Sequence, residues 1–206
     1  MSLEEFTKKH ILEDVKKLQY FFKLKSVTRY NTPREMEDDT ESVAEHLYGM
    51  QLLAQYFLPL EDPENLLNQS KIYQIITVHD FDEIETGDYL SYIKDETHKM
   101  ESQAALPKVL EQLPEHIKAT VTSLIDEYEL QETPEARFVK AIDKIEPLLQ
   151  VYNEKGRVIC HRNKCTADDS LRIKSKYIEH FPYIKKFALT LHQVLTDGGY
   201  YWKEGE

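Results

Sequence analysis

The sequence predicts an all-α protein, because apolar residues recur with helical spacing over most of its 206 residues. Only six glycines occur, and the alternating β-branched pattern of strands is scarce. Hydrophobic residues make up 41% of the chain and charged residues 31%, which suits a soluble globular protein with an apolar core. These observations favour a bundle of helices, and we expect residues 1–206 to form a single domain.

Three helices are predicted in the first 80 residues. The first has an apolar stripe of Ile11, Leu12, Val15, Leu18 and Phe22. A polar segment over 26–40 follows and is predicted to be a loop. A capping box of Ser42 and Glu45 begins the second helix, whose stripe consists of Val43, Leu47, Met50, Ala54 and Phe57. The third helix, over 65–80, buries Ile72, Ile75 and Ile76.

Four further helical segments are predicted in the rest of the chain. They cover residues 98–111, 114–130, 134–152 and 169–196. Pro114 takes a tolerated position in a first helical turn. The segment over 134–152 is expected to be disturbed near Pro147, and the last segment to break at Pro182.

Charge and cysteine content limit the partners. The net charge of −11 argues against a nucleic-acid polymer, and no apolar run approaches the roughly 20 residues that cross a membrane. The opening residues lack the apolar stretch of a signal peptide, so we expect a cytoplasmic protein. Cys160 and Cys165 flank His161, as half of a zinc site would. Two free thiols are the better interpretation, because no second Cys/His pair follows at zinc-finger spacing.

Titratable side chains occur on three apolar helix faces. His46 shares the stripe of the second helix, and His79 follows the isoleucines of the third at intervals of three, four and seven residues. Asp143 continues the stripe of the segment over 134–152. Asp80 is turned about 100° from His79, which leaves it at the edge of the same face. The chain therefore directs two imidazoles and two carboxylates inward.

Two interpretations of these four residues are open from the pattern alone. Each side chain could find its own partner, such as a backbone carbonyl or a lysine, because buried polar groups need one. Alternatively, one divalent cation would satisfy all four. Mixed nitrogen and oxygen ligands suit Mn, Fe, Co, Ni or Mg better than structural zinc.

The order His46, His79-Asp80, Asp143 resembles the HD-domain metal-dependent phosphohydrolases. The segments "ESVAEH", "HDFDEIETGD" and "EARFVKAID" are similar to the 5′-deoxynucleotidase branch of that family, which includes HD-domain-containing protein 2. The resemblance covers roughly residues 10–152. It implies a helical HD-domain bundle that holds one divalent metal ion between its helices and hydrolyses 5′-deoxynucleoside monophosphates to deoxynucleoside and phosphate.

The resemblance also implies roles for single residues. His46, His79, Asp80 and Asp143 would be the metal ligands. Glu83, in the HDxxE motif, would hold or protonate a water beside the metal.

Other matched positions would bind the substrate. Arg29 matches the phosphate-binding arginine of the family, and its guanidinium offers two parallel donors. Asp88 matches the position that meets the sugar hydroxyl, while Lys94 and Glu127 are weaker matches to the substrate pocket. The resemblance further suggests a homodimer.

The sequence departs from the family after Arg29, where "YNT" stands in place of a frequent tryptophan. The loop over 33–40 is also long and acidic, so base and sugar preference stay open. Two alternatives remain. The site could hydrolyse another small phosphorylated metabolite or a nucleoside polyphosphate, although a triphosphate would need more cationic residues. The chain could also be a non-catalytic metal- or ligand-binding module, which would not need Glu83 and Asp88.

Overall fold

The computed structural model describes residues 3–4, 6–34, 40–93 and 95–205. Within these ranges the regular structure is helical, apart from an isolated antiparallel bridge between Thr28 and Ser42. The all-α prediction is confirmed. The elements are α1 (Lys8–Phe21), the 3₁₀ turns η1 (Phe22–Lys25) and η2 (Arg29–Asn31), α2 (Val43–Glu61), α3 (Gln69–Val78), α4 (Glu83–Thr86), α5 (Glu96–Glu111), α6 (Glu115–Leu130), α7 (Pro134–Val151), α8 (Gly156–Arg162), α9 (Ala167–Ile178) and α10 (Pro182–Asp197).

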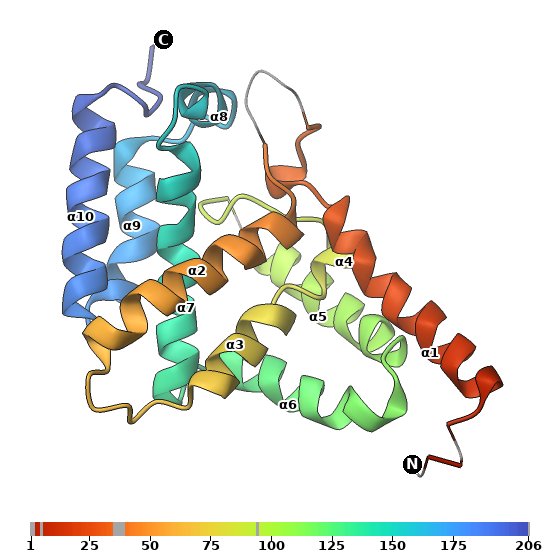
Figure 1. Ribbon diagram of the computed structural model, residues 1–206. Helices are drawn as coiled ribbons and strands as arrows, with labels where there is room; N and C mark the ends of the chain where they lie inside the picture. The colour runs from red at the N-terminus through yellow and green to blue at the C-terminus, as the bar shows by residue number, and fades with distance from the viewer. Residues whose placement is uncertain (1–2, 5, 35–39, 94, 206) are drawn as a thin grey trace.

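Helix α7 is the centre of the bundle. It packs against α2, α3, α6, α9 and α10, so most of its circumference is covered (Figure 1). Because α7 is covered on so many sides, three of its acidic residues are buried, namely Glu135, Asp143 and Glu146. Because ionised side chains are rarely buried unless they are paired, each of the three requires a partner from a neighbouring element.

Capping fixes where the helices that carry the site begin. The Ser42 hydroxyl accepts from the Glu45 N–H, and the Glu45 carboxylate accepts from the Ser42 N–H at 2.7 Å, which is the predicted capping box. His46 consequently lies one turn into α2, on its buried face. Asn68 caps α3 and Thr133 caps α7, through side chains that accept from backbone N–H groups. These caps set the rotational position of the helices that meet at the centre.

The two prolines of the C-terminal half behave differently. The predicted break at Pro182 is confirmed, because α9 ends at Ile178 and α10 begins at Pro182. The predicted disturbance near Pro147 is wrong, since α7 runs through this residue without interruption. Pro147 has no N–H to donate to the carbonyl of Asp143, four residues earlier. Packing of α7 against its neighbours maintains the helix despite the missing bond.

Helix α1 confirms the predicted element but leaves its apolar stripe uncovered. No residue of α1 is buried, and the exposed fraction of the stripe runs from 37% at Ile11 to 59% at Phe22. The helix lies along one side of the bundle and projects beyond it (Figure 1). None of the helices in the described ranges is long and apolar enough to cross a membrane.

Candidate metal centre

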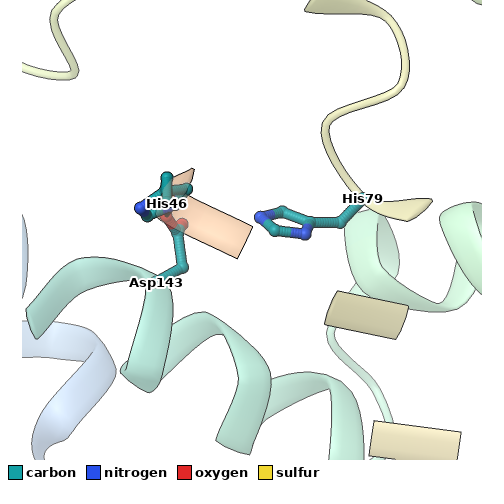
Figure 2. Close-up of side chains that lie close together, drawn as sticks. All are labelled: His46, His79 and Asp143. Carbon is teal, nitrogen blue, oxygen red and sulfur yellow. Dashed lines mark ion pairs between the residues drawn. The ribbon is translucent and has the colours of Figure 1, made fainter. Parts of the chain in front are cut away.

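Side chains from α2, from the turn directly after α3 and from α7 converge at the centre of the bundle. His46, His79 and Asp143 each bring one candidate ligand atom within 4.8 Å of the others (Figure 2). His46 Nε2 lies 3.4 Å from Asp143 Oδ1. Asp80 completes the group, with Oδ1 3.2 Å from His79 Nε2 and Oδ2 4.0 Å from His46 Nε2. The structure thus places all four predicted ligands together.

Hydrogen bonds on the Nδ1 atoms orient both imidazoles. His79 Nδ1 lies 2.9 Å from the Ile76 carbonyl oxygen, and His46 Nδ1 lies 2.8 Å from Glu146 Oε2. Both Nε2 atoms are buried and have no hydrogen-bond partner within the described part of the chain. Nitrogen atoms left unpaired in this way are costly. An imidazole held through Nδ1 presents Nε2 to a metal, so these residues fit a cation.

The two oxygens of Asp143 have different environments. Oδ2 accepts a hydrogen bond from the Tyr128 hydroxyl at 2.9 Å and lies 2.9 Å from Lys144 Nζ. Oδ1 faces His46. Burial opposes ionisation of Asp143, but the Lys144 ammonium and the His46 imidazole outweigh burial and hold its pKa well below the usual range. Asp143 is therefore an ionised, oriented carboxylate with one oxygen directed to the cluster.

The electrostatics of the cluster favour a positive charge beside His46. Burial and Arg29 lower the pKa of His46, yet the Glu146 and Asp143 carboxylates outweigh them and raise it to about 10. Burial lowers the pKa of His79. The carboxylates thus favour a cation next to His46. A divalent metal ion would supply this charge without protonation of the His46 imidazole.

Glu83 is buried close behind the cluster, although the local structure differs from the prediction. Helix α3 ends at Val78, and residues 79–82 form a turn in place of a further helical turn. The Glu83 N–H donates to the Asp80 carbonyl at 3.1 Å. Bonds of this i to i−3 type place residues three apart on one side of the chain. Glu83 therefore stays on the side of Asp80, and it is 5% exposed.

Arg29 and Asp88 form a buried pair. Asp88 Oδ2 lies 3.2 Å from Arg29 Nη1 and accepts from the Tyr30 N–H at 2.9 Å. The preceding Gly87 has a φ of +73°, and a Cβ there would lie 2.0 Å from Asn31 Oδ1. Only glycine allows this close turn. The residues implied separately for phosphate and sugar binding thus contact one another.

Sequence reasoning missed two buried carboxylates. Glu41 Oε1 lies 3.6 Å from Arg29 Nε and 4.0 Å from His46 Nδ1. It therefore links the arginine to the cluster of His and Asp side chains. Burial and the nearby Glu146 raise the pKa of Glu41 to about 7. Glu146 follows Asp143 by three residues, so helical spacing could have identified it. Glu41 precedes α2 and carries no periodic signal.

Glu127, implied for the substrate pocket, belongs to a separate hydrogen-bond network. Glu127 Oε1 accepts from Lys71 Nζ at 3.0 Å and from the Thr133 hydroxyl at 2.5 Å. This network joins the start of α3 to α6 and to the cap of α7, two turns of α3 away from His79. The implied contact of Glu127 with the substrate stays a prediction. Lys94 lies outside the described residues, as does most of the acidic loop over 33–40.

The cysteines are free thiols, as expected. Cys160 is buried in α8, and Cys165 lies half-buried in the turn after it. Among the described residues, neither cysteine belongs to a cluster that could hold a metal ion.

An all-α bundle with two histidines and two aspartates gathered from three helices is typical of one class of hydrolase. The chain belongs to the HD domain family, whose model matches residues 21–185. Family and cluster together indicate a divalent metal ion.

Curated relatives and solved structures narrow the comparison. The 5′-deoxynucleotidase HDDC2 of Xenopus laevis is 35% identical over 130 residues, which cover 62% of this chain and 62% of that protein. The 5′-deoxynucleotidase hdd1 of Schizosaccharomyces pombe is 30% identical over 171 residues, which cover 79% of this chain and 78% of that protein. A predicted metal-dependent phosphohydrolase from Magnetospirillum magnetotacticum has the same fold, with a TM-score of 0.79 at 21% identity over 95% of this chain and all of the other.

Proposed function

We propose that the chain is a metal-dependent phosphomonoesterase that hydrolyses 5′-deoxynucleoside monophosphates to deoxynucleoside and phosphate. The observation that carries the proposal is the continuity of three features: the His/Asp cluster, the buried Glu83, and the Arg29–Asp88 pair linked to the cluster through Glu41. The names of the relatives support the same substrate class. A module that only retained a metal would need neither the arginine pair nor Glu83.

In this proposal one divalent ion (Mn, Fe, Co, Ni or Mg) is held by His46, His79, Asp80 and Asp143. When bound, it would lower the pKa of a coordinated water and offset negative charge on the phosphate. Arg29, kept in place by Glu41 and Asp88, would bind the phosphate oxygens. Glu83 would accept a proton from the attacking water or return one to the departing 5′-oxygen.

The reaction is tested by measuring phosphate release from ribo- and deoxynucleoside monophosphates, and from the corresponding triphosphates, with Mn, Co, Ni, Fe and Mg in turn. We expect release from deoxynucleoside monophosphates with at least one metal. Release from nucleoside triphosphates alone would favour the polyphosphate alternative. The absence of release from every nucleotide with every metal would favour the non-catalytic binding module.

The choice between deoxyribose and ribose should depend on Asp88. Asp88 is only 2% exposed, so a sugar hydroxyl that pairs with its carboxylate must fit closely, and an added 2′-hydroxyl would be left without a partner. We expect kcat/KM for dAMP to exceed that for AMP at least about tenfold, the cost of one unsatisfied buried polar group. Asp88→Ala should lower turnover of dAMP and narrow this ratio.

Equal kcat/KM for the two nucleotides in the wild-type enzyme would contradict the sugar preference and leave the phosphatase activity untouched. Equal losses on dAMP and AMP in Asp88→Ala would show that Asp88 acts only by holding Arg29.

We also propose that residues 1–206 form one HD domain that acts in the cytoplasm as a homodimer. The uncovered stripe of α1 supports a dimer, because a second copy of α1 would bury the same apolar residues on both protomers. Leu12 and Leu18 are 51% and 45% exposed on this stripe.

Light scattering should find the wild-type chain at twice its monomer mass. Leu12→Asp combined with Leu18→Asp should yield monomers, because buried charges oppose the contact. Leu66→Asp, which alters an apolar residue 78% exposed between α2 and α3, is the control and should stay dimeric. A monomeric wild type, or a dimer that survives both changes in α1, would contradict the assignment.

A further inference from the structure

One pocket is lined both by residues of the candidate metal centre and by residues of the C-terminal helices. Arg29 and Asp143 line it, as do Lys174 of α9 and Tyr201. Much of the remaining lining is apolar and comes from α7, α8 and α9: Pro147, Leu148, Val151, Ile159 and Ile173.

Lys174 is a buried cation that lines this pocket from α9. It is 5% exposed, and its Nζ donates to the Ser170 carbonyl at 3.1 Å and to the Ser170 hydroxyl oxygen at 3.0 Å. The Ser170 hydroxyl lies 3.1 Å from the Tyr201 hydroxyl, whose other partner is His192 Nδ1 at 3.0 Å. This chain of bonds uses two of the three ammonium N–H groups. In the described ranges no acceptor takes the third, and no carboxylate lies within ion-pair distance.

Charges within the protein act on Lys174 in opposite directions, because the Lys144 ammonium opposes its protonation and the Asp143 carboxylate favours it. Burial lowers the pKa of its ammonium to about 8, so it remains mostly protonated at neutral pH. Cys160 and Cys165 also line the pocket. Burial raises the pKa of these thiols to about 12 and about 11, so they stay neutral. A buried ammonium with an unused N–H is costly. An oxygen on a ligand would complete its bonds.

The rest of the pocket decides what kind of oxygen fits. In the proposed function the phosphate group binds at Arg29, where a bound metal ion would add positive charge. A second phosphate would place a dianion among apolar side chains with a single free N–H, which is an unfavourable exchange. The flat, apolar faces of a nucleobase suit these walls, and a carbonyl oxygen on the base edge needs one donor.

We propose that this pocket is the nucleobase site, and that Lys174 donates a hydrogen bond to a carbonyl oxygen of the base. The proposal rests on the proposed function, which fixes the phosphate at Arg29. Thymine and uracil (O4) and guanine (O6) carry such an oxygen at the base edge where adenine and cytosine carry an amino group. An amino group opposite an ammonium would leave both donors unpaired. Lys174 thereby selects keto-bearing bases over adenine.

Selectivity is tested by kcat/KM for dTMP, dUMP, dGMP and dAMP. The wild-type enzyme should favour the three keto-bearing nucleotides over dAMP by about tenfold or more, the value of one hydrogen bond to a charged group. Lys174→Met keeps the length and apolar stem of the side chain and should bring these ratios close to one. Lys176→Met, at an exposed position of the same helix, should keep the wild-type ratios.

The substrate 2-deoxyribose 5-phosphate, which has no base, distinguishes a contact of Lys174 with the base from a contact with the phosphate. The loss caused by Lys174→Met should be about tenfold greater for dTMP than for this sugar phosphate. Equal losses would assign Lys174 to the phosphate and overturn the base site. A wild-type preference for dAMP, or an unchanged preference in a Lys174→Met protein with normal thermal melting, would overturn it as well.

Calorimetric binding of thymidine and deoxyadenosine distinguishes failure of this proposal from failure of the proposed reaction. The wild-type chain should bind thymidine about tenfold more tightly, and Lys174→Met should remove the difference. If this result is found in a protein that hydrolyses no nucleotide, the base site stands and only the reaction is wrong. Equal affinities, or no binding of either nucleoside, overturn the base site.

Discussion

Asp143→Ala should abolish stoichiometric metal binding and, with it, phosphate release. The residue supplies an ionised oxygen that faces His46 at 3.4 Å, and its other oxygen is fixed by Tyr128 and Lys144. Loss of an outer partner of a metal ligand typically weakens binding by about 10- to 100-fold. Loss of an anionic ligand itself should weaken it by at least about 100-fold. Metal analysis after dialysis should find about one divalent ion per wild-type chain and almost none in the variant.

A second variant guards against a general loss of structure, because removing Asp143 leaves Lys144 without its buried partner. Asp143→Asn keeps the shape and the contact with Tyr128 while removing the charge, and it should also lose the metal. Asp126→Ala changes an exposed aspartate of α6 and should retain it. If either variant of Asp143 binds metal as the wild type does, Asp143 is not a ligand.

The residues that could be predicted from the sequence are those whose position follows from helical periodicity. His46 lies one turn after a capping box that the sequence displays, so both its helix and its buried face were predictable. Asp143 lies on a stripe of apolar residues long enough to define a face. The break at Pro182 followed from the missing N–H of proline. In each case a local rule acts in the same direction as the tertiary structure.

The residues that could not be predicted depend on contacts between distant segments. Glu41 reaches Arg29 and His46 from a segment without periodicity. The pairing of Arg29 with Asp88 depends on a glycine turn that approaches Asn31. No local sequence pattern predicts the contacts of Glu41 or the pairing of Arg29 with Asp88.

Tertiary packing also overrode two local expectations. Pro147 was expected to disturb α7, but burial on several sides maintains the helix. The stripe of α1 has the pattern of a buried face and is nevertheless exposed. A pattern shows that a face is apolar, and the rest of the fold decides whether the same chain covers it.

Glu83→Gln should retain the metal ion and lose most of the turnover. Glu83 is buried beside Asp80, to whose carbonyl its N–H is bonded. It also lies close enough to Arg29 for its carboxylate to help raise the pKa of that guanidinium, against the effect of burial. In the proposed function, a carboxylate next to both Asp80 and Arg29 can move a proton at the reacting oxygen. General acid–base groups contribute about 10²- to 10⁴-fold in rate, so kcat should fall by a factor in this range.

Measuring metal content and activity for each variant distinguishes a proton-transfer role of Glu83 from a metal-ligand role. Asp143→Asn should lose both quantities together, whereas Glu83→Gln should lose only activity. Glu85→Gln is the matched control: it changes an exposed glutamate of the same short helix, bonded to Tyr20, and should leave both quantities unchanged. Glu83→Gln with kcat within about a factor of two of the wild type would exclude the proton-transfer role, because such groups contribute at least about 10²-fold. Loss of the metal in Glu83→Gln would instead place Glu83 among the residues that hold the ion.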